Sequence, residues 1–272
     1  MQPEDLKDRS PMSLPGPEFA SLIRQYTGDV GHVRPSELGT MSDLTALVEC
    51  EAGPFFIKAV RNKPGGRRDS LVRERLINPH VRPLSPSLLW HTQDDDWIAL
   101  GFEVVEGRPA DFGRNSPELP GIVDALNQIA DLPLPEIALD WTETRWDSYA
   151  NPQDLEHFRG DALLHADINI FNLMVGDALW VVDWAWPTRG AAFIEPALFA
   201  VQLIAEGHTA DSAESWAAGC VSWVDADPEA IDAFALANQR MWDDLSGRAP
   251  DRRWMKTMAG AAHEWTAHRG LG

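Results

Sequence analysis

The N-terminal part of the chain carries hydrophobic runs of the length and composition of β-strands. Residues 44–50 (LTALVEC) and 54–60 (PFFIKAV) are rich in β-branched and aromatic residues. The link between them is short and contains glycine, which favours a hairpin. Residues 87–91 and 97–105 have the same character and flank a turn of three aspartates. This pattern predicts a β-rich region.

Beyond residue 107 the hydrophobic positions recur at helical spacing. Within 117–132, Ile122, Leu126 and Ile129 fall on one face of a helix. Residues 133–150 are rich in proline and tryptophan and give no clear pattern. Further helices are predicted at 195–205, 210–223, 228–245 and 251–267. Two more are predicted in the N-terminal part, at 17–26 and 69–77.

Strands come first and helices second, and this order predicts an α+β fold with two lobes. A tail at 1–17 is followed by an N-lobe at 18–106 and a helical C-lobe at 107–272. Lobe junctions are common ligand sites, so a cleft is expected there.

Composition and charge narrow the classes of protein. Hydrophobic residues make up 44% of the 272 positions, enough for a large core, and no apolar run has the length of a membrane span. The N-terminus lacks the apolar stretch of a secretory signal, and two cysteines make no disulfide framework, so a cytoplasmic protein is expected. The formal charge of -19 disfavours nucleic acid and anionic membranes as partners.

The main candidate for chemistry is the stretch from His165 to Asp183. Asp167 and Asn172 lie five residues apart on a predicted loop, and Asp183 follows the apolar run LWVV. Oxygen-bearing side chains of this kind suit Mg²⁺. Phosphoryl transfer needs a carboxylate for the attacking hydroxyl and metal ions for the phosphate charge. Asp167 is predicted to serve the first need, and Asn172 and Asp183 the second; the alternative is that the loop residues only make side-chain turns.

Lysine is rare in this chain, which draws attention to Lys58 inside the apolar run FFIKAV. A lysine in such a strand needs a partner for its charge. Glu74, on the next predicted helix, is the natural partner, and together they would hold the phosphates of ATP. The alternatives are an edge strand with Lys58 in solvent and a solvated helix face around Glu74.

These residues, in this order and spacing, resemble the aminoglycoside phosphotransferase family, which includes choline-kinase-like and other small-molecule kinases. The resemblance covers about residues 30–245 and implies a protein-kinase-like bilobal fold that uses ATP and magnesium. It implies that Asp167 is the catalytic base and that Asn172 and Asp183 are magnesium ligands. Lys58, paired with Glu74, would bind phosphate, and His165 would support the loop.

The resemblance also implies a hinge at 101–107, where backbone groups around Glu103 to Val105 would bind adenine. The chain departs from the family pattern in two places. Ala166 stands where the family often has glycine between the histidine and the aspartate. The loop at 36–43 has a single glycine, Gly39, instead of the glycine-rich pattern of protein kinases.

The phosphate acceptor is harder to predict. Trp184, Trp186 and Arg189 follow Asp183 and are candidates for an acceptor pocket, although the tryptophans are equally suited to packing. Acidic residues of the C-terminal helices are further candidates for holding an amine: Glu206, Asp243 and Asp244.

The sequence thus predicts an ATP-dependent kinase of a small hydroxylated molecule. Three alternatives remain open: a catalytically inactive nucleotide-binding scaffold, a kinase of peptide or protein hydroxyls, and a metal-dependent hydrolase. The short segment between Asp183 and Glu195 leaves no room for a long activation loop, which argues against a protein substrate. No second histidine lies at ligand spacing from His165, which argues against the hydrolase.

Overall fold

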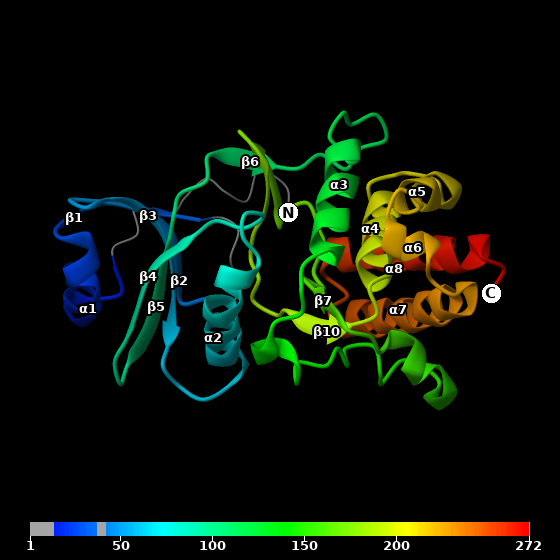
Figure 1. Ribbon diagram of the computed structural model, residues 1–272, viewed down its shortest axis with the longest axis horizontal. Helices are drawn as coiled ribbons and strands as arrows, with labels where there is room; N and C mark the ends of the chain where they lie inside the picture. The colour runs from blue at the N-terminus through cyan, green and yellow to red at the C-terminus, as the bar shows by residue number, and fades with distance from the viewer. Residues whose placement is uncertain (1–13, 37–41, 272) are drawn as a thin grey trace. The chain divides into compact units, whose positions relative to one another are not determined.

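The computed structural model describes residues 14–36 and 42–271. The chain forms two compact units (Figure 1). Unit 1 consists of Met1–Gly107 and Val182–Ala185, and unit 2 consists of Arg108–Val181 and Trp186–Gly272. The lobes predicted from the sequence were continuous stretches, whereas here the short segment Val182–Ala185 belongs with the N-terminal unit.

Unit 1 is built on a five-stranded antiparallel sheet with the strand order β1-β2-β3-β5-β4. The strands are β1 (Val30–Pro35), β2 (Leu44–Cys50), β3 (Gly53–Arg61), β4 (Leu88–Gln93) and β5 (Trp97–Phe102). The helices are α1 (Pro17–Thr27), α2 (Gly66–Ile77) and the short 3-10 helix η2 (Asn78–His80). The predicted hairpin is confirmed as β2 and β3, in a register that pairs Thr45 with Lys58.

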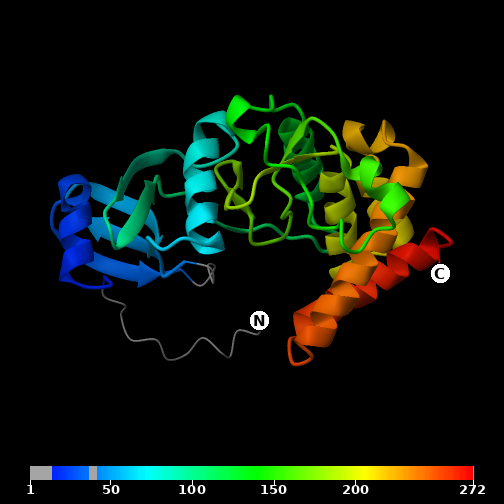
Figure 2. The same ribbon diagram turned by 90° about the horizontal axis from the view of Figure 1, so that it is seen from below.

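The two faces of this sheet are covered by different helices, α1 on one side and α2 on the other (Figures 1 and 2). Phe55, Ile57 and Ala59 of β3 pack in one apolar cluster with residues of α1. The intervening residues Phe56 and Val60 pack in a second cluster with α2. Because strand residues alternate between faces, the same alternation puts Lys58 on the α2 face.

Unit 2 is mainly helical. Its helices are α3 (Leu119–Ala130), α4 (Ile194–Ala205), α5 (Ala210–Ala217), α6 (Val221–Val224), α7 (Pro228–Arg248) and α8 (Arg253–His268), with 3-10 helices η3 (Glu136–Ala138) and η4 (Pro152–Phe158). Two small sheets accompany them, in the orders β10-β7 and β6-β8-β9. Their strands are β6 (Gly107–Pro109), β7 (Ala162–Leu164), β8 (Leu173–Gly176), β9 (Leu179–Val181) and β10 (Thr188–Gly190). Helices α7 and α8 pack side by side as an antiparallel pair (Figure 2).

The predicted helix at 210–223 is wrong in one respect, because the structure breaks it into α5 and α6. At Gly219 an added Cβ atom would lie 2.8 Å from Cγ1 of Val123 in α3, so this close approach requires glycine. Asn127 of α3 holds both sides of the break. It donates to the carbonyl of Gly219 at 3.1 Å and accepts the N–H of Val221 at 3.0 Å.

Two other differences concern strands. The strand β1 was not predicted, since its residues alternate poorly and only one of them, Val33, is buried. The strand predicted at 97–105 ends at Phe102, where the chain leaves the sheet.

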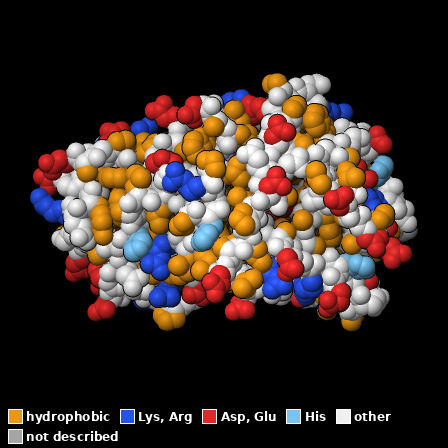
Figure 3. Space-filling view, viewed as in Figure 1, with side chains coloured by type: hydrophobic (Ala, Val, Ile, Leu, Met, Phe, Trp, Pro, Cys, Tyr) orange, Lys and Arg blue, Asp and Glu red, His pale blue; other side chains and the backbone are white. Residues whose placement is uncertain are grey.

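No helix among residues 14–36 and 42–271 combines the length and the apolar character needed to cross a membrane. Acidic side chains lie at many separate places on the visible face of both units (Figure 3). Negative side chains are therefore spread over the surface seen in this view.

Candidate functional site

Lys58 makes two short ion pairs within unit 1. Its Nζ atom lies 2.6 Å from Oε1 of Glu74 and 2.6 Å from Oδ1 of Asp183. Lys58 is 8% exposed and Glu74 is 5% exposed, whereas the Asp183 side chain is 44% exposed. The sheet and α2 thus bring together three residues that the sequence singled out, and the edge-strand alternative for Lys58 is excluded because β3 lies inside the sheet.

Burial and charge act in opposite directions on this cluster. Burial by itself would lower the pKa of Lys58, but the carboxylates of Asp183 and Glu74 outweigh burial and hold the pKa above its ordinary value. Burial raises the pKa of Glu74 to about 6, although the charge of Lys58 opposes this rise. The ammonium group is therefore charged at neutral pH and directed at two carboxylates, of which Asp183 is the more accessible.

Asp167 and Asn172 lie within hydrogen-bonding distance of each other in unit 2. Nδ2 of Asn172 donates to Oδ2 of Asp167 at 2.9 Å and to its carbonyl oxygen at 2.8 Å. Asn169 also donates to this carbonyl, at 3.0 Å. Asp167 is exposed while Asn172 is 6% exposed. The carboxylate of Asp167 is therefore exposed to solvent, and the buried amide of Asn172 holds it in place.

His165 supports this loop from the interior. It is 1% exposed, and its Nδ1 atom accepts the backbone N–H of Asp167 at 3.3 Å. Its position fits the supporting role that the resemblance implied.

The backbone has unusual geometry at the residues next to this chemistry. Ala166 and Asp183 have φ angles of 60° and 62°, in the left-handed region, and they are the non-glycine residues with positive φ among residues 14–36 and 42–271. Such conformations cost free energy and are concentrated at functional sites. The departure from glycine at Ala166 is thus accommodated without leaving the left-handed conformation.

Glu195, at the start of α4, is a site residue that the sequence analysis missed. It is 3% exposed and accepts backbone N–H groups of Ala166, at 2.8 Å, and of His165. Burial raises its pKa to about 7, although these hydrogen bonds and the charge of Arg145 oppose the rise. The available signal was a single carboxylate inside the apolar run AAFIEPALFA, which predicts a buried acid with a specific partner.

We expect Glu195→Gln to remove a pH dependence of stability. The pKa of Glu195 rises from 4.5 in the unfolded chain to about 7, so the folded state binds its proton more tightly. Wild-type stability should therefore fall as pH rises from 4.5 to 7, by about 3 kcal/mol, and stay level above that range. Denaturant unfolding of both proteins at several pH values measures the difference. Glutamine keeps an oxygen acceptor for the loop, so equal pH slopes in the two proteins would contradict the buried ionisation.

The predicted hinge has two backbone groups that make no hydrogen bond with the described residues. Glu103 is tied to Ser87 twice: its N–H donates to the Ser87 carbonyl at 2.9 Å, and its Oε1 accepts the Ser87 N–H at 2.6 Å. The carbonyl of Glu103 and the N–H of Val105 make no hydrogen bond with the described residues. These are a donor and an acceptor of the kind that an adenine ring needs.

The acceptor candidates differ in exposure. Trp184 is 1% exposed and is therefore packed, whereas Trp186 is 37% exposed. Arg189 is occupied by structural contacts: Asp161 at 2.5 Å, and the carbonyls of Gly160 and Leu139 at 3.1 and 3.0 Å.

Two of the acidic candidates also have partners. Asp243 contacts His263 at 2.9 Å, and Asp244 accepts the hydroxyl of Tyr149 at 2.8 Å. The loop at 36–43, which has a single glycine, lies partly outside the described residues, which omit 37–41.

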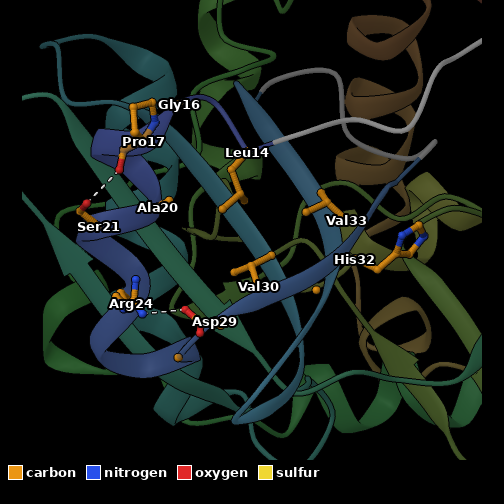
Figure 4. A pocket seen from close by; sticks show the side chains of 12 residues that line it. Leu14, Gly16, Pro17, Ala20, Ser21, Arg24, Asp29, Val30, His32 and Val33 are labelled. Atoms are coloured by element: carbon orange, nitrogen blue, oxygen red, sulfur yellow. Dashed lines mark hydrogen bonds and ion pairs between the residues drawn. The ribbon is translucent and has the colours of Figure 1, made fainter.

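One hollow in unit 1 is separate from these residues. Its volume is about 860 Å³, and it lies between α1 and β1 beside the Arg24–Asp29 ion pair (Figure 4). A second hollow of about 460 Å³ in unit 2 is bordered by Arg159 and Arg189. Arg189 is the one candidate that borders either hollow.

The candidate metal ligands have donor atoms of the kind that Mg²⁺ prefers. Asp183 offers a partly exposed carboxylate, and Asn172 uses its Nδ2 as a donor, which leaves its amide oxygen as the acceptor. Each side chain therefore offers an oxygen atom, and Mg²⁺ takes few protein ligands because it keeps waters and phosphate oxygens. Each of the two residues, taken by itself, has a donor atom that fits the ion.

Comparisons with protein-family models and with curated protein sequences find no match. Solved structures do match. An aminoglycoside phosphotransferase of Alicyclobacillus acidocaldarius is 11% identical with a TM-score of 0.65, over 98% of this chain and 99% of that chain. Choline kinase LicA of Streptococcus pneumoniae is 13% identical with a TM-score of 0.61, over 90% and 96%. An aminoglycoside phosphotransferase of Streptomyces rimosus, in complex with ADP and streptomycin, is 18% identical with a TM-score of 0.57, over 82% and 97%.

These likenesses define the fold. The chain has the protein-kinase-like fold, a β-sheet region followed by a helical region, and so confirms the predicted α+β class. Within that class its fold is the one shared by aminoglycoside phosphotransferases and choline kinases, as the resemblance implied.

Proposed function

We propose that this protein is an ATP-dependent phosphotransferase that moves the γ-phosphate of ATP to a hydroxyl of a small molecule. The observation that carries this proposal is the buried Lys58, paired at 2.6 Å with both Glu74 and Asp183. A lysine held in this way between a helix glutamate and a metal-binding aspartate is the arrangement that kinases use to hold phosphates. The fold supports the same reading, since its solved neighbours include phosphotransferases of small molecules.

Each residue has a distinct role in this proposal. Lys58 binds the α- and β-phosphates, and Glu74 keeps its ammonium group in place. Asp167 accepts the proton of the attacking hydroxyl, and Asn172 orients its carboxylate through the 2.9 Å hydrogen bond. Asn172 and Asp183 would hold magnesium, which neutralises charge on the phosphate oxygens when it is bound.

The nucleotide would be recognised through the hinge. The carbonyl of Glu103 and the N–H of Val105, which make no hydrogen bond with the described residues, suit the edge of an adenine ring. A neighbour in complex with ADP supports nucleotide binding by this fold.

A small acceptor is favoured because only a short segment separates Asp183 from Glu195. Of the two tryptophans, Trp186 is the better candidate for lining the acceptor pocket, because it is 37% exposed whereas Trp184 is packed.

The test is ADP formation from ATP and magnesium against a panel of hydroxylated amines, amino alcohols and sugars. We expect at least one acceptor to raise the rate above the acceptor-free level, with a phosphorylated product detectable by mass spectrometry. Calorimetry with ATP and magnesium serves as the parallel measurement. Nucleotide binding without transfer to any acceptor would favour an inactive scaffold instead.

A further inference from the structure

One peptide of the loop that carries Asp167 adopts a conformation that L-residues avoid. Ala166 has a φ of 60° and is 0% exposed. In this region the Cβ atom crowds the following carbonyl oxygen, and glycine alone escapes the cost. A non-glycine residue stays there where the surrounding groups determine its conformation. The residue before the proposed base therefore depends on groups outside the loop.

Side chains from two other segments hold both polar backbone groups of Ala166. Its N–H donates to Oε1 of Glu195 at 2.8 Å. Its carbonyl oxygen accepts a hydrogen bond from Nη1 of Arg145. The carboxylate thus holds the peptide group before the Cα atom of Ala166, and the guanidinium holds the peptide group that joins Ala166 to Asp167.

Arg145 is itself held in place by a chain of contacts that reaches α7. Its backbone N–H donates to Oε1 of the buried Glu143 at 2.7 Å. Its guanidinium carbon lies 5.0 Å from the centre of the Trp146 ring. Nε1 of Trp146 donates to Oδ1 of Asn238 at 3.2 Å, and Asn238 is 0% exposed. Burying an amide side chain costs free energy, and the hydrogen bond to Trp146 offsets part of that cost for Asn238.

We propose that Arg145 is a positioning residue which, opposite Glu195, holds the left-handed Ala166 peptide and thereby sets Asp167 for proton transfer. The inference rests on the proposed function of Asp167. Arg145 contributes through the Ala166 carbonyl, and its replacement therefore changes the placement of the carboxylate. A misplacement of about 1 Å near reacting atoms is enough to lower a rate by about a hundredfold.

The left-handed strain at Ala166 makes a specific rescue possible. If Arg145 holds a strained alanine, then Ala166→Gly removes the strain and reduces the need for the guanidinium. The left-handed conformation disfavours alanine by roughly tenfold relative to glycine, which sets the size of the rescue. If Arg145 only stabilised the fold or bound a ligand, glycine at position 166 would not restore activity to the Arg145→Met variant.

The kinetic experiment uses full-length protein, magnesium-ATP and the best acceptor of the panel described above. Arg145→Met should lower kcat by roughly fiftyfold with KM for ATP within about twofold of wild type. Arg145→Lys, which keeps one donor, should lose only about fivefold. Ala166→Gly in the Arg145→Met background should recover roughly tenfold. Arg253→Met, at an exposed position on α8, is the matched control and should keep wild-type kcat.

Hydrogen exchange supplies a readout that is independent of turnover. Arg145→Met should speed amide exchange in residues 163–172, and Ala166→Gly in the same background should slow it again. Unchanged exchange in this segment, an unchanged kcat, a loss confined to KM, or no recovery with glycine would each overturn the positioning role. A wild-type protein that transfers phosphate to no acceptor would instead overturn the proposed function, and exchange alone would then decide the role of Arg145.

Discussion

Asp167→Asn is expected to lower acceptor-dependent phosphoryl transfer by roughly a thousandfold, because the amide can no longer take the proton of the attacking hydroxyl. Asparagine keeps the size of the side chain. It also keeps an oxygen that can accept from Nδ2 of Asn172, as Oδ2 of Asp167 does at 2.9 Å in the wild-type protein. The loop should therefore keep its conformation, and the melting temperature should stay within a few degrees of wild type. The fall should lie in kcat and leave the KM for ATP nearly unchanged.

The matched control for this variant is Asp225→Asn. Asp225 is an exposed aspartate at the end of α6, so its replacement makes the same change of charge away from the loop. Both variants are compared by steady-state ADP formation and by thermal unfolding. Wild-type turnover in Asp167→Asn would show that another group accepts the proton, and the assignment of the base would be wrong.

The sequence predicts the placement of Lys58 because the strand pattern carries the information. Alternation along β3 determines which residues share a face, and α2 follows β3 closely enough that Glu74 is the natural partner. The proximity of Asp167 and Asn172 could also be predicted from local spacing, because the two residues lie five positions apart on one loop. Local patterns of this kind remain informative without any tertiary contact.

Other features depend on contacts between distant segments and could not be predicted in this way. Glu195 meets Ala166 across 29 positions of the chain, and Arg145 meets it across 21. These two partners hold Ala166 in its left-handed conformation, and they lie too far along the chain to be found from the spacing of residues within the loop. The break at Gly219 likewise depends on Val123 and Asn127, residues of another helix.

Lys58→Met is expected to reduce kcat/KM for ATP by roughly a hundredfold or more, because the phosphates lose a charged donor in a desolvated position. It should also destabilise unit 1. Removing one partner of a buried ion pair leaves the other uncompensated, at a cost of about 3 kcal/mol at pH 7. Lys63→Met, at an exposed position of the same unit, is the control that should change neither quantity.

The pH dependence of the Lys58→Met variant separates the stabilising role of the lysine from its phosphate-binding role. Burial already raises the pKa of Glu74 to about 6 against the opposing charge of Lys58, so loss of the lysine raises this pKa further. The folded variant then binds a proton that the unfolded chain releases above 4.5, and its stability falls as pH rises from 4.5 through the raised pKa. The deficit relative to wild type should therefore be small at pH 5 and larger at pH 8.

Adding Glu74→Gln to Lys58→Met removes the buried carboxylate that causes this deficit. We expect the double variant to recover most of the stability at pH 8, as measured by denaturant unfolding, while turnover stays low because the phosphate-binding ammonium group is still missing. Recovery of turnover together with stability would mean that Lys58 acts only by neutralising Glu74. Low turnover in a stable double variant would instead support direct binding of phosphate by Lys58, because the fold is then intact and the missing group is the cation itself.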